Sequence, residues 1–415
     1  MQIGIIGLGY VGLPLAVAFA EAGHEVVGVD LDPAKVEALN AGRSYVEDIA
    51  DEALAPLGER LRASGSYADL AGCEAVIVCV PTPLTDSREP DLSYLTDSGT
   101  ALAETLSAGQ LVVLESTTYP GTTRERLLPI LERSGLSAGT DFHLAFSPER
   151  IDPGNTEYTV RTTPKLVGGI TPACAERARA LYELVCDEVI VLSSPETAEL
   201  AKLLENIFRS VNIALVNELS QLCDRLGIDV WEVIDAAATK PFGFMPFEPG
   251  PGMGGHCLPV DPFYLAFRAR QLDFYPEFIE LAGKVNQAQP AFCVERIERA
   301  LNQAGKPVNG SRILILGAAY KGGVGDVRES PALKIIGRLQ DLGGEISYHD
   351  PFVPELPGHG LASIELDPGL ATADLVAIVT AHPGIDYADV VSRATQTIDF
   401  RGVTRGVEAE NLTRL

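Results

Sequence analysis

Cys257 is the side chain whose surroundings best suit chemistry. It stands in the stretch PGPGMGGHCLPVDPFY, residues 249–264, after four glycines and shortly before Asp261. Glycines let the backbone approach a ligand closely, and the prolines limit how far such a loop can flex. A thiol held in this way is typical of a nucleophile pressed against a substrate. The alternative is a buried structural cysteine, because most free cysteines behave as small hydrophobic residues.

Lys202 and Asn206 form a second candidate pair on a predicted long helix. Ser194 as the N-cap, Pro195 in the first turn and Gly227 at the end predict roughly 32 helical residues, nearly 50 Å long. The i,i+4 spacing puts Lys202 and Asn206 on one face, where they could grip a hydroxyl and its transferring proton. A lysine at the solvated edge of an apolar stripe is the alternative. A helix of this length is typical of a domain connection or a dimer interface.

The chain begins with a pattern typical of dinucleotide binding: a strand over 2–6, a glycine loop, a helix over 13–22 and a strand over 24–29. Gly7 would make the tight turn, Gly9 would let a pyrophosphate sit against the backbone, and Gly12 would let helix and strand pack closely. Asp30 would accept hydrogen bonds from the ribose hydroxyls. Because Asp30 and Asp32 would repel a 2′-phosphate, NAD is predicted rather than NADP.

Polar residues follow three further predicted strands. The strands cover 75–80, 111–115 and 142–146, and the residues just beyond them include Thr82, Thr117 and Glu149. In open parallel sheets, ligands gather at the carboxyl ends of the strands, so these residues outline one rim. Ordinary turn chemistry is the alternative for each of them, since Ser, Thr and Pro favour turns.

The second half of the chain predicts a helical stretch and then another α/β unit. Helices are expected over 229–238 and 263–304, the latter kinked or broken at Pro290, with the loop 239–262 between them. After a polar hinge, strands are expected over 312–316, 345–348, 374–380 and 395–400, and a helix over 330–342. Lys321 and Arg328 fall in the first loop of this unit, where they suit a phosphate or are ordinary surface charge.

Composition excludes several classes of function. The chain has 415 residues, which predicts two or three domains, and a net charge of −25, which disfavours nucleic acid and membrane surfaces as partners. Seven cysteines without a CxxC pair argue against a disulfide framework and against a zinc site, and they favour reducing cytosol. We expect no metal, no signal peptide and no membrane-spanning helix.

Taken together, these motifs resemble the UDP-glucose/GDP-mannose dehydrogenase family along the whole chain. The matching stretches are the opening GxGYVGLP, PTP, ESTTYPGTT, SPER, ELAKLLEN, GGHC with its following aspartate, and AYKxxxxDxRESPA. Within the family the chain looks most like the UDP-N-acetylglucosamine 6-dehydrogenase branch, with UDP-glucose and UDP-N-acetylmannosamine dehydrogenases as the nearest alternatives. Val260 stands where the UDP-glucose enzymes usually carry a lysine, and His256, rather than serine, precedes the cysteine.

The resemblance implies a four-electron oxidation of a sugar C6 alcohol to a carboxylate, with two NAD used in turn. Cys257 would trap the intermediate aldehyde as a thiohemiacetal, a second hydride transfer would leave a thioester, and water would release the acid. Lys202 would stabilise the developing alkoxide and oxyanion, and Asp261 would take protons through an ordered water. Asn206 would position the reacting oxygen, and Glu149 would activate the hydrolytic water. Thr117 would support the water or the nicotinamide.

The resemblance also implies binding residues. Those expected to contact NAD are Gly7, Gly9, Tyr10, Val11, Gly12, Asp30, Lys35, Thr82, Thr117 and Arg328. Those expected to contact the UDP-sugar are Glu149, Arg150, Lys202, Asn206, Phe244, Gly254 and Lys321.

These inferences predict an α/β protein with two Rossmann-like parallel-sheet domains joined by a helical region that contains the long helix. The expected parts are an NAD-binding domain over 1–193, a helical central and dimerisation region over 194–305, and a UDP-sugar-binding domain over 306–415, with the active site in the cleft between the two sheets. A homodimer or higher homo-oligomer in the cytoplasm is expected. The alternatives are a two-electron hydroxyacid dehydrogenase, which needs no cysteine, and a catalytically silent NAD-binding scaffold.

Overall fold

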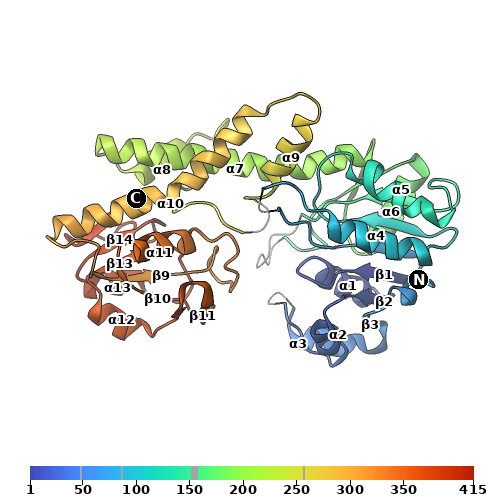
Figure 1. Cartoon of the computed structure of the whole chain (residues 1–415), viewed down its shortest axis with the longest axis horizontal. Coiled ribbons are helices and arrows are strands. Elements are labelled where there is room, and N and C mark those ends of the chain that lie inside the picture. The colour runs from blue at the N-terminus through green and yellow to red at the C-terminus, as the bar shows by residue number, and fades with distance from the viewer. Residues whose placement is uncertain (47–48, 86, 151–157, 256–257) are drawn as a thin grey trace. The chain divides into compact units, whose positions relative to one another are not determined.

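The computed structural model describes residues 1–46, 49–85, 87–150, 158–255 and 258–415, and the chain divides into two compact units (Figure 1). Unit 1 comprises Met1–Glu205 and Phe263–Tyr275, and unit 2 comprises Asn206–Pro262 and Pro276–Leu415. Each unit is built around its own sheet, as the sequence predicts. No helix in the described ranges is both long enough and apolar enough to cross a membrane.

Unit 1 contains an eight-stranded sheet in the order β3-β2-β1-β4-β5-β6-β7-β8, parallel except between β6 and β7. The strands are β1 (Gln2–Ile6), β2 (Glu25–Val29), β3 (Leu61–Ser64), β4 (Ala75–Val78), β5 (Leu111–Leu114), β6 (His143–Phe146), β7 (Lys165–Gly169) and β8 (Val189–Leu192). The order of the first six strands is that of the dinucleotide-binding fold, in which ligands bind beyond the carboxyl ends near the switch between β1 and β4.

Helices cover both faces of the sheet of unit 1, which is why its central strands are continuous apolar runs. One face packs against α1 (Gly12–Glu21) and α6 (Pro172–Tyr182), and the other against α4 (Ser93–Thr105), the π-helical turn Thr123–Leu127 and α5 (Leu128–Leu131). The shorter helices α2 (Pro33–Asn40) and α3 (Asp51–Leu54) also belong to this unit.

Unit 2 contains a five-stranded, wholly parallel sheet in the order β10-β9-β13-β14-β15. The strands are β9 (Arg312–Leu316), β10 (Glu345–His349), β13 (Leu375–Ile378), β14 (Thr397–Asp399) and β15 (Leu412–Arg414), beside a small antiparallel pair, β11 (Glu355–Leu356) and β12 (Leu361–Ala362). Its helices are α8 (Val230–Ala238), α10 (Glu277–Gln303), α11 (Pro331–Asp341), α12 (Leu366–Thr372) and α13 (Tyr387–Arg393). Two parallel α/β sheets confirm the predicted fold class.

The long helix α7 (Pro195–Leu226) has the predicted length of 32 residues and both predicted ends. The Ser194 hydroxyl accepts a hydrogen bond from the Thr197 N–H at 3.2 Å, and Gly227 adopts a φ of +67° just beyond the last turn. The division between the two units falls within this helix, after Glu205.

The helical stretch predicted over 263–304 is broken, but the predicted position of the break, at Pro290, is wrong. The structure has two helices here, α9 (Asp261–Arg270) and α10 (Glu277–Gln303), and Pro290 lies inside the second one. The chain turns at Asp273, whose φ is +55°, and resumes a helix after Pro276. A proline inside a helix removes one backbone hydrogen bond, but α10 buries Cys293, Ile297 and Leu301 in the core of unit 2, and this burial keeps the helix continuous.

Candidate functional site

The glycine loop of unit 1 fits a dinucleotide. Gly7 has a φ of +90°, and a Cβ built on it would lie 2.5 Å from the carbonyl oxygen of Cys79. A Cβ on Gly12 would lie 1.8 Å from the carbonyl oxygen of Gly7, so both positions need glycine for the fold itself. A Cβ on Gly9 would meet nothing within 4 Å in the described part of the chain. The bare backbone of Gly9 therefore faces open space at the N-terminus of α1, where a pyrophosphate is favoured.

Asp30 is fixed beside this loop. One of its oxygens accepts the Leu8 N–H at 2.9 Å, and the other accepts the Asp32 N–H at 3.0 Å. The Lys35 ammonium lies 3.3 Å from the same carboxylate. The predicted cofactor residues Asp30 and Lys35 are thus brought together at the end of β2, while Tyr10 is exposed and Val11 is half-buried at the start of α1.

Thr82 and Thr117 are brought together beyond the carboxyl ends of β4 and β5. The buried Thr82 hydroxyl donates to the carbonyl oxygen of Thr117 at 2.7 Å. The carbonyl oxygen of Thr82 in turn accepts the phenol of the fully buried Tyr264 at 2.7 Å. Sequence reasoning missed Tyr264, although its place in the first turn after Asp261 was a signal for it.

Glu199 on α7 anchors the loop that carries Thr117. Its carboxylate accepts the Gly121 N–H at 2.6 Å, and it accepts both the N–H and the hydroxyl of Thr123, at 2.9 and 2.7 Å. Burial raises the pKa of Glu199 to about 7 in spite of these donors. Lys202 lies three residues further along α7 and is buried, and no carboxylate in the described part of the chain lies within ion-pair distance of its ammonium.

Glu149 and Arg150 follow β6 and have different partners. Glu149 lies with its carboxylate 3.8 Å from the ammonium of Lys165. The guanidinium of Arg150 pairs with Glu205 at 2.8 Å and donates to the carbonyl oxygen of Pro164 at 2.6 Å. Both predicted residues therefore lie at the same edge of the sheet, each fixed by buried or half-buried contacts.

Asn206 and Asp261 are brought into direct contact in unit 2. The Asn206 amide donates to the Asp261 carboxylate at 2.5 Å, and both side chains are buried. Asp261 is also the first residue of α9, where a carboxylate interacts favourably with the positive end of the helix dipole. Sequence spacing relates Lys202 to Asn206, but only the structure relates Asn206 to Asp261.

The glycine-rich loop before Cys257 is fixed at its start by a chain of buried amides. The Gly250 N–H donates to the Asn217 side chain at 3.0 Å, Asn217 donates to Asn286 at 3.0 Å, and Asn286 donates to the carbonyl oxygen of Ser210 at 3.0 Å. These contacts connect the loop to α7 and α10, and sequence reasoning missed them.

The end of the same loop packs on the segment after β9. The Gly255 N–H donates to the carbonyl oxygen of Arg328 at 3.1 Å, and a Cβ on Gly254 would lie 2.8 Å from the Cβ of Tyr320. Packing against Tyr320 therefore requires glycine at position 254, independently of the predicted contact with the UDP-sugar. His256 and Cys257 lie outside the described residues, so the predicted nucleophile stays a prediction.

The loop after β9 is organised by a buried Asp350–His382 pair that sequence reasoning missed. Asp350 accepts the N–H groups of Ala318 and Ala319 at 2.7 and 3.0 Å, and it contacts the His382 ring at 2.9 Å. Burial alone would raise the pKa of Asp350, but the hydrogen bonds from His382 and the two N–H groups lower it below its usual value. Asp350 directly follows β10 as Asp30 directly follows β2, which was the available signal.

The remaining predicted residues lie near the surface of unit 2. The guanidinium of Arg328 makes a forked contact with the Asp326 carboxylate, with the shortest distance 2.6 Å. Lys321 is half-buried, and Phe244 is exposed. Within the described ranges, no group of three or more His, Cys, Asp or Glu side chains could hold a metal ion.

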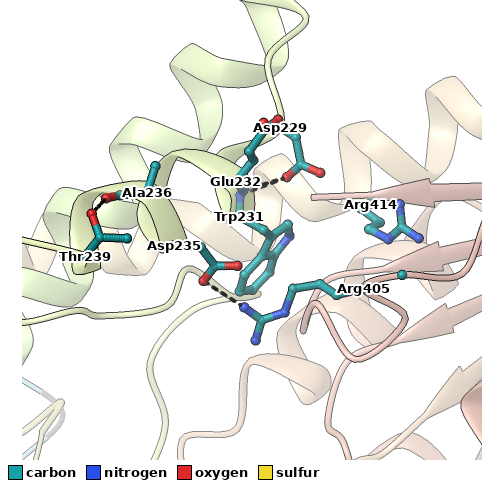
Figure 2. A pocket seen from close by; sticks show the side chains of 9 residues that line it. Asp229, Trp231, Glu232, Asp235, Ala236, Thr239, Arg405 and Arg414 are labelled. Atoms are coloured by element: carbon teal, nitrogen blue, oxygen red, sulfur yellow. Dashed lines mark hydrogen bonds and ion pairs between the residues drawn. The ribbon is translucent and has the colours of Figure 1, made fainter.

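A pocket of about 450 Å³ lies elsewhere in unit 2, between α8 and the segment around Arg405 (Figure 2). Arg405 stacks on the Trp231 ring at 4.9 Å from the centroid and pairs with Asp235 at 3.4 Å. None of the residues predicted for catalysis or binding lines this pocket. It is therefore separate from the candidate site.

Sequence models of the UDP-glucose/GDP-mannose dehydrogenase family match almost the whole chain. The NAD binding domain matches residues 1–186, the central domain 196–288 and the UDP binding domain 314–406. The first match agrees with the Gly7–Asp30 region described above. The third covers the loop after β9, with Lys321, Arg328 and the Asp350–His382 pair.

Named relatives act on several sugars. The chain is 36% identical to a UDP-N-acetyl-D-mannosamine dehydrogenase of Pyrococcus horikoshii, over 98% of this chain and 100% of the relative. It is 37% identical to a UDP-N-acetyl-D-glucosamine 6-dehydrogenase of Pseudomonas aeruginosa, over 85% and 83%. It is 35% identical to an NDP-N-acetyl-D-galactosaminuronic acid dehydrogenase of Ralstonia nicotianae, over 97% and 96%.

The solved structures to which the chain is similar are also nucleotide-sugar dehydrogenases. The structure of the UDP-D-ManNAc dehydrogenase from Pyrococcus horikoshii has a TM-score of 0.92 and 34% identity, and it covers 100% of this chain and 99% of its own. A UDP-glucose dehydrogenase from Pyrobaculum islandicum has a TM-score of 0.89 and 30% identity, over 99% and 96%.

Proposed function

Because the chain belongs to the UDP-glucose/GDP-mannose dehydrogenase family, we propose that it oxidises the C6 hydroxyl of UDP-N-acetylglucosamine to a carboxylate. It is an NAD-dependent oxidoreductase with a UDP binding domain, which supports a UDP-sugar as substrate. The observation that carries the proposal is the buried Asn206–Asp261 contact, one helical turn along α7 from the buried Lys202. An amide, a carboxylate and an ammonium are the groups that an alcohol oxidation needs at the reacting oxygen.

NAD fits the residues of unit 1, because Gly9 leaves open space beside the N-terminus of α1 and Asp30 is held next to the loop. We propose that Gly9 and Asp30 hold it, together with the other residues predicted for the cofactor, namely Gly7, Tyr10, Val11, Gly12, Lys35, Thr82, Thr117 and Arg328. When bound, NAD supplies the hydride acceptor for each of the two oxidations.

Lys202 and Asn206 hold the C6 oxygen in the proposed reaction. The Lys202 ammonium stabilises negative charge as it develops on that oxygen, and the Asn206 amide orients it. Asp261 takes the hydroxyl proton, through a water where the distance requires one. These roles need the two α7 residues on one face of the helix, which their i,i+4 spacing provides.

Cys257 makes the second oxidation possible in this proposal. An aldehyde cannot lose a second hydride until a nucleophile adds to its carbonyl, and the Cys257 thiolate adds to give a thiohemiacetal. Oxidation of that adduct leaves a thioester. Glu149 then takes a proton from water as the water oxygen bonds to the carbonyl carbon, the carbon–sulfur bond breaks, and the carboxylate leaves.

The choice of sugar rests on the motifs around the cysteine. KPFGFMPFEPGPGMGGHCLPVDPFYL resembles the acetamido-sugar branch, and Val260 departs from the lysine usual in the UDP-glucose enzymes. The relatives named as dehydrogenases of N-acetylmannosamine, N-acetylglucosamine and N-acetylgalactosaminuronic acid nucleotides have nearly equal sequence identity to this chain, at 36%, 37% and 35%. UDP-N-acetylmannosamine is therefore the alternative substrate. We propose Arg150, Phe244, Gly254 and Lys321 as further UDP-sugar contacts.

The test is the amount of NADH formed per UDP-sugar consumed, with UDP-N-acetylglucosamine, UDP-glucose and UDP-N-acetylmannosamine at equal concentration. We expect about two NADH per sugar, fastest with UDP-N-acetylglucosamine, and no complete turnover by Cys257→Ala. Two NADH with another sugar fastest would keep the mechanism and change the substrate. One NADH per sugar, with Cys257→Ala fully active, would favour the two-electron hydroxyacid dehydrogenase instead.

We further propose a cytoplasmic homodimer with the three parts 1–193, 194–305 and 306–415. Each of the three family matches falls within one of these parts. The six described cysteines are all free, which suits a reducing compartment. In the single chain α7 exposes Phe208, Leu215 and Leu222 at seven-residue intervals. A second copy of the helix would bury such a stripe.

A further inference from the structure

A buried group of charges in unit 1 has no part in the reaction as set out above. Lys165, Glu115 and Tyr182 are all less than 9% exposed, and they lie beside Glu149. The Lys165 ammonium forms a close ion pair with one oxygen of Glu115, whose other oxygen accepts the Tyr182 phenol at 2.7 Å. On its other side the same ammonium lies 3.8 Å from the Glu149 carboxylate.

The topology of the sheet explains how these side chains meet. Glu115 directly follows β5, and Glu149 comes three residues after β6, so both lie beyond carboxyl ends. β7 is antiparallel to β6, with Phe146 opposite Gly168. Continuing this register by three residues sets Lys165 level with Glu149. Because β7 runs antiparallel to β6, Lys165 at the start of β7 lies at the edge of the sheet where β5 and β6 end.

The neighbouring carboxylates of Glu115 and Glu149 keep Lys165 protonated. Burial alone would lower the pKa of Lys165, but Glu115 and Glu149 outweigh it and raise the pKa above its usual value. Burial raises the pKa of Glu115 to about 7, against the opposing effect of Lys165. The Lys165 ammonium also lies 5.0 Å from the centre of the Tyr182 ring, which adds a cation–π contact. Removing a partner from such a buried group is costly, so its geometry is well fixed.

A small cavity adjoins the group. It measures about 10 Å³, and the described residues that line it include Glu149, Lys165 and Thr163. A volume of this size is about that of one water-sized group. Glu149 and Lys165 therefore line the same small cavity.

We propose that Lys165 is a positioning residue for Glu149, held in place by Glu115 and Tyr182, and that it directs the Glu149 carboxylate in thioester hydrolysis. The proposal rests on the proposed function, in which Glu149 takes the proton of the attacking water. Lys165 touches neither substrate nor cofactor in this scheme. It fixes where the carboxylate oxygen lies, and a misplacement of about 1 Å at such a group costs on the order of 100-fold in rate.

The test is Lys165→Met in the full-length protein, with intact-mass measurement during turnover. The two oxidations precede hydrolysis, so the first turnover still yields about two NADH per active site. The steady-state kcat falls on the order of 100-fold, and the enzyme accumulates with the mass of the sugar-nucleotide acyl adduct on one cysteine. Lys165→Arg keeps the charge and restores part of the hydrolysis rate. Lys306→Met makes the same substitution at an exposed ion pair with Asp374 and leaves the kinetics unchanged.

Two milder variants keep the test decisive if Lys165→Met does not fold. Tyr182→Phe and Glu115→Gln each loosen Lys165 without removing it, and we expect smaller reductions in kcat with the same adduct. If the folded variants slow turnover without accumulating adduct, or accumulate none while turning over normally, the positioning role is wrong.

Glu149→Gln separates this inference from the proposed function. If Glu149→Gln accumulates the adduct and the Lys165 and Tyr182 variants do not, only the role of Lys165 fails. If the unmodified enzyme forms one NADH per sugar, the thioester mechanism fails, and the role of Lys165 fails with it.

Discussion

Gly9 and Gly12 belong to one loop but are required for different reasons. A Cβ at position 12 would collide with the carbonyl oxygen of Gly7, whereas a Cβ at position 9 would meet no atom of the described chain within 4 Å. Gly9→Ala should therefore leave the unfolding temperature nearly unchanged and weaken NAD binding at least about tenfold, because the methyl group occupies space next to the pyrophosphate.

The matched comparison is Gly12→Ala, measured by thermal unfolding and by NAD titration. It should destabilise the protein by roughly 1–3 kcal/mol or prevent folding, because overpacking against backbone cannot be relieved by a side-chain rotation. Equal NAD affinity in Gly9→Ala and the unmodified protein would mean that the cofactor does not approach this backbone.

Glu199 should make stability depend on pH. Its pKa is about 7 when folded, against 4.5 as the ordinary value, so between these pH values the folded state keeps a proton that the unfolded state has lost. Its contribution is complete below pH 4.5 and is lost as the pH rises through 7. The free energy of unfolding of the unmodified protein, minus that of Glu199→Gln, should fall by about 3 kcal/mol from pH 4.5 to pH 8.

Glu196 provides the control, since it lies on the same helix in an ion pair with Arg124. Burial opposes ionisation there, but the hydrogen bond from Arg124 lowers the pKa of Glu196 below its ordinary value. The difference between the unmodified protein and Glu196→Gln should stay flat from pH 5 to pH 8 in urea denaturation. A flat difference for Glu199→Gln as well would show that Glu199 is ionised throughout this range.

At the scale of elements, the loop before Cys257 depends on the amide chain between α7 and α10. Asn217→Ala leaves the Gly250 N–H and one side of Asn286 without their buried partner. Each of these two groups costs about 1–3 kcal/mol, so we expect a loss of roughly 2–6 kcal/mol in the free energy of unfolding, together with a lower kcat.

Asn212→Ala is the matched control on the same helix. Among the described residues its amide donates only to the exposed Phe208 carbonyl oxygen, and its loss should change stability by less than about 0.5 kcal/mol. The two variants are compared by urea denaturation and by initial rates. Equal effects of the two substitutions would mean that the loop is not held through Asn217.

Local sequence rules predicted the elements whose determinants are local. The glycine loop, the capped ends of α7 and most strands of the two sheets follow from turn residues, caps and apolar runs. The break between α9 and α10 did not, because Pro290 is tolerated by burial while Asp273 makes the turn. β3, β7, β8 and β15, and the small pair β11 and β12, were missed. β3, β8 and β15 are edge strands of three or four residues, which carry little periodic signal, and β7 is a short apolar run that ends in two glycines.

The residues of the candidate site also separate into those that local sequence rules predict and those that they do not. The i,i+4 pair Lys202 and Asn206 could be read from spacing, and the strand ends pointed to Thr82, Thr117 and Glu149. Contacts between distant segments could not be read, such as that of Asn206 with Asp261 or of Lys165 with Glu149. The contact of Lys165 with Glu149 depends on the antiparallel step at β7, and that of Asn206 with Asp261 joins α7 to the start of α9. No local pattern encodes either arrangement.

At the scale of the whole molecule, the exposed face of α7 argues for self-association. Leu215 is 64% exposed and Leu222 is 50% exposed in the single chain, and Phe208 precedes them at the same seven-residue interval. Leaving large apolar side chains in water along one helix is unfavourable. Full burial of an exposed leucine contributes about 1.5–3 kcal/mol, and each of these leucines would gain the part that corresponds to its exposed fraction. Two copies of a helix with this spacing can pack their stripes against each other.

Leu215→Glu should therefore convert a dimer into a monomer, because a carboxylate at the centre of an apolar interface is left without a partner. Sedimentation velocity should show the smaller species, and far-UV circular dichroism should show unchanged helix content. Leu342→Glu adds the same charge at an exposed leucine beyond the end of α11 and should leave the dimer intact. If both variants sediment as the unmodified protein does, α7 is not the interface. If the unmodified protein is itself a monomer, the exposed stripe serves another purpose.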